Sequence, residues 1–137
     1  MTAARTRLTG PLLVAGLAGL GVGYLALVDP HTPGHYPGCP ILFLTGYWCP
    51  GCGGLRALHD LSHGQVSSAV SANLVVVALV PIAVTLWARW VVTRVTAAPA
   101  QTRTEQGATR WWLWSLLVVV LLFWGLRNLP AGAWLAP

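Results

Sequence analysis

Charged residues are scarce in this chain of 137 residues, because only 8% are Asp, Glu, Lys or Arg. A soluble globular domain carries roughly a quarter of such residues. Only three residues are acidic and lysine is absent, so that all eight basic residues are arginine. Hydrophobic residues make up 55% of the chain. This composition excludes an ordinary soluble protein and indicates a protein of the membrane.

The sequence also lacks the common motifs of enzyme sites. It has no nucleotide-binding loop, no nucleophile elbow and no zinc-protease helix, and no histidine directly follows its CxxC pair as haem attachment requires. The net charge of +5 does not indicate a nucleic-acid partner, because no soluble basic surface exists to carry it. We identify no catalytic residue, and whether the protein is an enzyme stays open, with a structural role for the cysteine turn favoured over an oxidoreductase.

Three apolar runs cover residues 10–28, 70–88 and 111–126. Each approaches the roughly 20 residues with which an α-helix crosses about 30 Å of hydrocarbon. The sequence therefore predicts an all-α integral membrane protein with three transmembrane helices in one domain, residues 1–137. Four other segments surround these spans: a cytoplasmic tail (1–9), an outer loop (29–69), a cytoplasmic link (89–110) and an outer tail (127–137).

The first apolar run exceeds the usual length of a signal-peptide core, which is roughly 7–15 residues. No small-x-small cleavage site follows it in "DPHTPGHYPG". We therefore expect residues 10–28 to be retained as a membrane helix.

The arginines predict how the chain is oriented. Six of them lie either before the first span or between the second and third spans: Arg5, Arg7, Arg89, Arg94, Arg103 and Arg110. Two spans separate these segments, so both lie on the same side of the membrane. Positively charged segments stay in the cytoplasm, so the N-terminus is expected inside and the C-terminus outside. The absence of lysine is also a hint of a high-GC bacterium. We therefore expect a multi-pass protein of the bacterial cytoplasmic (inner) membrane.

The outer loop contains three kinds of segment. "DPHTPGHYPGCP" is too rich in proline for a helix. Residues 41–48 are apolar but too short to span, which predicts a re-entrant or interfacial segment. Residues 55–70 have the periodicity of an amphipathic helix, which Gly64 weakens or splits in two.

Three cysteines are the main candidates for chemistry. Cys49 and Cys52 belong to "CPGCGG", a turn that places two sulfurs on one side, and Cys39 is a third thiol upstream. A closed zinc site needs four ligands. The same thiols can instead form a disulfide in an oxidising compartment, or cycle as a C-x-x-C redox pair. A metal clamp, a structural disulfide and free thiols all remain open.

Histidines are weaker metal candidates. His59 and His63 are four residues apart, so they share a helix face and complete a C-x2-C-x6-H-x3-H set. The gap of six residues is shorter than the roughly 12–15 residues of ordinary fingers. His35 is a further candidate, together with His31. A single histidine at a membrane surface is more often only a polar surface group.

Two arginines are candidates for a polar pocket. Arg56 and Asp60 are one helical turn apart and can pair, although near lipid we expect Arg56 rather to donate to carbonyls or to a lipid phosphate. Arg127 follows the third apolar run on the same predicted outer side. We expect Arg56 and Arg127 to flank one pocket.

"TGYWCPGCGGLRAL" resembles the signature of a small bacterial three-span membrane family, a domain of unknown function, of the form G-x-x-C-P-x-C-G-x-T-R-A. The resemblance extends from about Cys39 to Pro130 and includes "LRNLP". It implies six family-type positions: Cys39, Cys49, Cys52, Gly53, Arg56 and Arg127. Leu55 replaces the common threonine, and the two helix histidines lie outside the pattern. The family brings no established activity.

We expect from these features a non-enzymatic accessory or complex-forming membrane protein, whose outer loop is held by a cysteine clamp of metal or disulfide. The alternative is a membrane thiol-disulfide or metal-handling factor that uses Cys49 and Cys52 with Cys39. Zinc is the cofactor that these ligand types suit. The expected partners are the lipid bilayer and other membrane proteins or a second copy, since Gly19 and Gly23 form a small-xxx-small face.

Overall fold

The computed structural model describes residues 2–96 and 103–136, and every regular element in these ranges is helical. The elements in chain order are α1 (Thr2–Leu27), α2 (Pro40–Thr45), α3 (Gly54–Ser62), α4 (Val66–Thr96), α5 (Arg103–Arg127) and the 3-10 helix η1 (Pro130–Leu135).

Three of these helices are long and apolar enough to cross a membrane. The segments concerned are Leu8–Leu27 of α1, the whole of α4, and Arg110–Arg127 of α5. The predicted fold class, an all-α protein with three membrane-crossing helices, is therefore confirmed by the length and composition of these helices.

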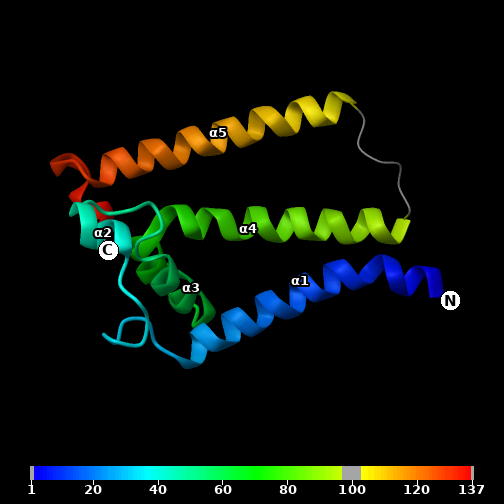
Figure 1. Cartoon of the computed structure of the whole chain (residues 1–137), viewed down its shortest axis with the longest axis horizontal. Coiled ribbons are helices and arrows are strands. Elements are labelled where there is room, and N and C mark those ends of the chain that lie inside the picture. The colour runs from blue at the N-terminus through cyan, green and yellow to red at the C-terminus, as the bar shows by residue number, and fades with distance from the viewer. Residues whose placement is uncertain (1, 97–102, 137) are drawn as a thin grey trace.

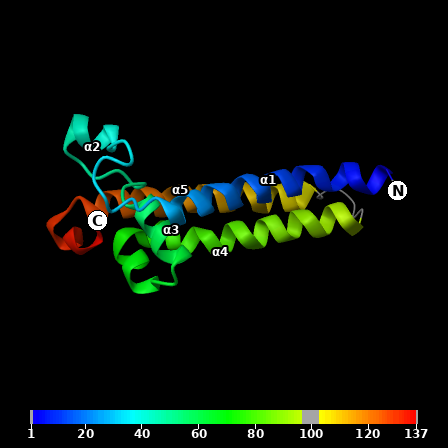
Figure 2. The same ribbon diagram turned by 90° about the horizontal axis from the view of Figure 1, so that it is seen from below.

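The three long helices lie lengthwise in the molecule, and the short elements gather at one end (Figures 1 and 2). The N-terminus, the end of α4 and the start of α5 lie at the opposite end (Figure 1). All the predicted outer-loop residues and the C-terminal segment are thus brought together at the end that carries α2, α3 and η1.

The helices extend beyond the predicted spans. Helix α1 begins at Thr2, and α4 continues to Thr96, because neither segment contains a residue that stops a helix. Helical structure therefore reaches into the predicted N-terminal tail (1–9) and into both ends of the predicted link (89–110), whose residues 97–102 lie outside the described ranges. Two tryptophans of α4 join it to α1 near this end: the Trp87 indole N–H donates to the carbonyl of Pro11 (3.1 Å), and Trp90 packs against Gly10.

The predicted amphipathic segment 55–70 is split at Gly64, one of the two outcomes expected. Gly64 adopts a left-handed conformation (φ +74°). Its N–H donates to the carbonyl of Leu61, and the N–H of Gln65 donates to the carbonyl of Asp60 (2.8 Å). This is the Schellman arrangement that ends a helix. Helix α3 stops there, and α4 starts at Val66 in a new direction.

The small core lies where α3 meets the beginning of α4. Ala57 of α3 packs against Ala69 and Ala72 of α4, and all three side chains are buried. Small side chains allow the two helix backbones to approach closely. This contact fixes α3 across the end of α4, and thereby positions the turn that precedes α3.

We predict that Gly64→Ala lowers the thermal midpoint of the protein in detergent, because a Cβ in the left-handed region costs about 1–2 kcal/mol. Nothing lies within 4 Å of a Cβ at this position, so the effect is one of backbone conformation alone. Gly21→Ala is the matched control, since Gly21 is inside α1 and also has an open Cβ position. This control should be neutral or stabilising. Equal midpoints for both variants would contradict the prediction.

Candidate functional site

The three cysteines lie together at the end of the molecule that carries α2 and α3. The Sγ atom of Cys49 is 3.2 Å from that of Cys39 and 3.0 Å from that of Cys52. All three sulfurs lie within 4.8 Å of one another, so they can hold one metal ion. Cys52 is buried, Cys39 and Cys49 are half-buried, and all three are free thiols.

Local backbone geometry places these sulfurs. The N–H of Cys52 donates to the carbonyl of Cys49 (3.1 Å), closing a turn with Pro50 at the position that proline favours. Gly53 follows in a left-handed conformation (φ +78°) and starts α3. Pro40 at the first position of α2 keeps Cys39 extended. A residue with a side chain would be strained at Gly53, so the glycine of the predicted motif is required by the turn.

The surroundings divide the thiols into two kinds. Backbone N–H groups at the start of α2, first that of Leu42, lower the pKa of Cys39 to about 7, and the Cys49 thiol adds to this effect. Burial raises the pKa of Cys52 to about 12, and contact with Cys49 adds to it. At neutral pH the half-buried Cys39 therefore loses its proton more readily than the buried Cys52.

Asn73 of α4 binds the backbone of the cysteine turn. Its side-chain amide N–H groups donate to the carbonyls of Pro50 (2.9 Å) and Cys52 (3.0 Å), and its Oδ1 accepts from the N–H of Val76 (3.0 Å). The backbone of Asn73 is extended (φ −163°, ψ 97°), so α4 is interrupted there. Asn73 is thus the N-cap of the second part of α4 and also a support of the cysteine turn.

Arg127 holds the same turn from α5. Its side chain is almost completely buried, at 1% exposure, and donates to the carbonyls of Cys49 (2.9 Å) and Cys52 (3.2 Å). It also donates to the carbonyl of Leu135 in η1 (3.0 Å). A buried guanidinium needs such acceptors, because an unpaired buried charge is costly. Arg127 therefore joins α5, η1 and the turn.

Asn128 fixes the residue before the turn. It accepts a hydrogen bond from the N–H of Trp48 (2.8 Å) and donates one to the carbonyl of Trp48 (2.9 Å). The amide side chain thus pairs with both backbone groups of one residue, as a neighbouring strand would. Asn73 and Asn128 were not among the site residues expected from sequence. The sequence did contain one indication of them. Both are polar amides at the edge of an apolar run, where polar groups commonly have a specific partner.

Arg56 and Arg127 have different surroundings, and the cavity that Arg56 lines does not include Arg127. Arg127 binds the carbonyls of the cysteine turn, whereas Arg56 is exposed and lines a cavity of about 520 Å³ together with all three cysteines and Gly53. In the part of the chain that the structure describes, the carboxylate of Asp60 is near His31 (3.7 Å) and forms no ion pair with Arg56.

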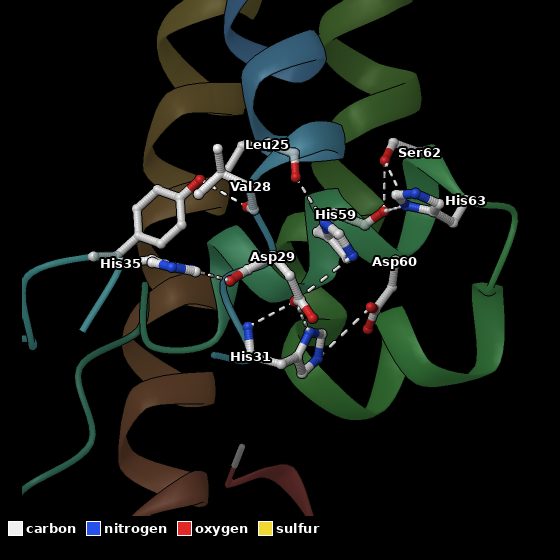
Figure 3. Close-up of polar contacts among 10 residues, drawn as sticks. Leu25, Val28, Asp29, His31, His35, His59, Asp60, Ser62 and His63 are labelled. Atoms are coloured by element: carbon white, nitrogen blue, oxygen red, sulfur yellow. Dashed lines mark hydrogen bonds and ion pairs between the residues drawn. The ribbon is translucent and has the colours of Figure 1, made fainter. Parts of the chain in front are cut away.

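The histidines do not join the three sulfurs as ligands, although His31 lines the same cavity. His59 is grouped with Asp29 and His31, not with the sulfurs, so the structure does not assemble the C-x2-C-x6-H-x3-H ligand set (Figure 3). Helix α3 rises about 1.5 Å per residue, which carries His59 away from the turn at its start. His63 approaches the carbonyl of His59 (3.0 Å), and His35 approaches that of Asp29 (3.4 Å).

The fold and the site together define a helical membrane protein with a cluster of three cysteines at one end. Residues 39–87 match the model of a family described as "Protein of unknown function (DUF2752)". The expected resemblance to a family of unknown function is thus confirmed, over a shorter range than the expected Cys39 to Pro130. No curated protein and no solved structure matches the chain.

We predict that Asn73→Ala destabilises the protein in detergent by about 2–4 kcal/mol. The substitution removes a helix cap, leaves the carbonyl of Pro50 without the amide donor, and leaves Arg127 as the side-chain donor to the carbonyl of Cys52. Asn73→Ser keeps an acceptor for the cap but cannot reach the turn, so it should recover only about 1 kcal/mol. The measurement is chemical unfolding in micelles. A serine variant as stable as the native protein would show that the contacts with the turn contribute nothing.

Proposed function

We propose that this chain is a non-enzymatic accessory protein of a bacterial membrane, whose outer loop is closed by a metal ion bound to Cys39, Cys49 and Cys52. The observation that supports this most strongly is the approach of three sulfurs, all within 4.8 Å, from two separate segments of the loop. A metal there would join the start of α2 to the turn before α3.

The ligand chemistry favours a thiophilic ion. Three thiols cannot all be used by disulfides within one chain, but all three can bind one ion. Thiolates suit Zn²⁺ and Cu⁺. Zn–S bonds of about 2.3 Å in a tetrahedron place sulfurs roughly 3.8 Å apart. The sulfurs of Cys49 and Cys52, now 3.0 Å apart, would have to separate by less than about 1 Å.

The fourth ligand of a zinc ion would come from outside this group. The three cysteines line the cavity of about 520 Å³, which leaves room for water or for a group from a partner. Asn73 and Arg127 already hold the carbonyls of the turn, so the ion would bind a largely preformed site. A preformed site on the outer loop suits a protein that presents this loop to a partner.

Thiol-disulfide exchange is the second candidate. The observation that favours it is the position of the Cys49 sulfur, which lies close to the sulfurs of both Cys39 and Cys52. The Cys39 thiolate would attack the Cys49 sulfur of a Cys49–Cys52 disulfide, forming the Cys39–Cys49 bond and releasing Cys52 as thiolate. The pKa of about 7 makes Cys39 a ready nucleophile. The pKa of about 12 makes Cys52 a poor leaving group, which weighs against this exchange.

The proposed location is the bacterial cytoplasmic membrane, with the N-terminus inside and the C-terminus outside. The distribution of arginine supports it. Helix α2 exposes Phe43 (89%) and Leu44 (79%), which suits contact with the lipid interface. A Cβ at Gly19 or Gly23 would meet nothing within 4 Å, so this face of α1 is open to another helix, from a second copy or another membrane protein.

We predict that the protein, purified in detergent without oxidation, binds Co²⁺ as a probe with a thiolate-to-metal charge-transfer absorption. Cys39→Ser should weaken this binding at least tenfold, because one of three thiolates is lost. Thr45→Ser is the control, since it keeps a hydroxyl that donates to the carbonyl of Ile41 within α2. A metal-free protein with two of its three thiols oxidised and easily reduced would favour the exchange reaction instead.

We also predict that a membrane-impermeant maleimide labels Cys39 from outside intact cells, after treatment with reductant and chelator. The control replaces the three cysteines with serine and introduces Thr96→Cys at the end of α4, which should be labelled only after the cells are opened. Labelling of Cys39 only in opened cells would overturn the proposed orientation.

A further inference from the structure

A second group of ligating side chains, separate from the three cysteines, lies beside α3 (Figure 3). The chain has four histidines and two aspartates, and contacts among them or with their backbone groups link all six: Asp29, His31, His35, His59, Asp60 and His63. In a chain with only three acidic residues, such a concentration on one side of α3 calls for a physical explanation.

His59 is oriented by the end of α1. Its Nδ1 lies 2.6 Å from the carbonyl of Leu25, and because a carbonyl only accepts, Nδ1 carries the proton of this hydrogen bond. In the neutral ring Nε2 then has a lone pair, and it faces Oδ1 of Asp29 at 3.7 Å. Two acceptors face each other there, and a cation between them would satisfy both.

His31 completes the same face. Its Nδ1 lies 2.8 Å from Oδ1 of Asp29, and the coordinating atoms of Asp29, His31 and His59 all lie within 4.8 Å of one another. The other ring nitrogen of His31, Nε2, faces Oδ1 of Asp60 at 3.7 Å. Each imidazole thus has one nitrogen beside Asp29, and its other nitrogen faces a second acceptor: the carbonyl of Leu25 for His59 and the carboxylate of Asp60 for His31.

Asp60, beside His31, is a buried carboxylate with one unpaired oxygen atom. Its side chain is only 2% exposed, and its Oδ2 has no hydrogen-bond partner. A buried carboxylate without a positive partner is unfavourable. Metal-binding histidines commonly donate their second N–H to a carboxylate or a carbonyl, which are the groups that Asp60 and Leu25 present here.

We propose that Asp29, His31 and His59 bind a first-row divalent cation such as Zn²⁺, which both imidazole and carboxylate ligands suit, and that Asp60 positions His31. His31 would bind through Nδ1, replacing the proton that it now shares with Asp29, and His59 would bind through Nε2. Such ligands suit an ion of intermediate softness, unlike the three thiolates. The side chains of Asp29 and His31 are 49% and 42% exposed, so the ion could enter from solution.

The site would fasten α1 to α3. Asp29 and His31 follow the end of α1, whereas His59 and Asp60 belong to α3, so one ion would connect segments about 30 residues apart in sequence. It is independent of the cysteine site, because it uses none of the same residues.

The test measures Zn²⁺ bound per chain, by dialysis of the full-length protein in detergent against buffered zinc. The native protein should bind one more ion than His59→Asn. The asparagine amide can still donate to the carbonyl of Leu25, but it has no counterpart of Nε2, so the variant removes the ligand and keeps the contact with α1. Asp60→Asn should retain the site with an affinity about 10–100-fold lower.

His63→Gln is the matched control, because its ring packs on that of His59 (4.4 Å between centroids) but is not one of the proposed ligands. It should bind as much zinc as the native protein. The Co²⁺–thiolate absorption, if present, should be unchanged in His59→Asn, which separates this site from the cysteine site. Equal zinc content in the native protein and His59→Asn, or an equal loss in His63→Gln, would overturn the proposal.

Discussion

The structure depends on hydrogen bonds from two buried side chains to one turn of the backbone. Asn73 and Arg127 donate to the carbonyls of Cys49, Pro50 and Cys52 from two different long helices. The carbonyl of the buried Cys52 is shielded from water, so its hydrogen-bond donors come from side chains. Because each donor also caps or joins its own helix, the turn is the point at which α3, α4, α5 and η1 are connected.

The chemistry of the chain is concentrated at one end of the molecule and divided between two groups of ligands. Three sulfurs lie at the turn before α3, whereas imidazole and carboxylate groups lie beside α3, near the end of α1. Soft thiolates and harder nitrogen and oxygen ligands select different ions. The start of α3 carries the turn, and its later residues His59 and Asp60 face the residues that follow α1. His31 nevertheless lines the same cavity as the three cysteines.

Several features could be predicted from particular residues. The apolar runs predicted three long helices, and the CPGCG pattern predicted a turn with two sulfurs on one side. The division between α3 and α4 at Gly64 was one of the two outcomes that this glycine indicated. These rest on length, backbone conformation and spacing, which are local properties. The pairing of Arg56 with Asp60, which was considered from their helical spacing, does not occur, because Asp60 is turned towards His31. Spacing along a helix shows which residues can meet, and burial then decides which do.

The sequence by itself determined the class of protein and the elements that carry the cysteines, because hydrophobicity and turn chemistry act over a few residues. Only the tertiary structure decided which distant groups share a site. It placed Asn73 and Arg127 on the same carbonyls and brought His59 to Asp29, although these residues are far apart in the chain. The physical reason is that a buried polar group forms hydrogen bonds with the groups that the packing of the helices brings within reach, and no local sequence pattern predicts which groups these are.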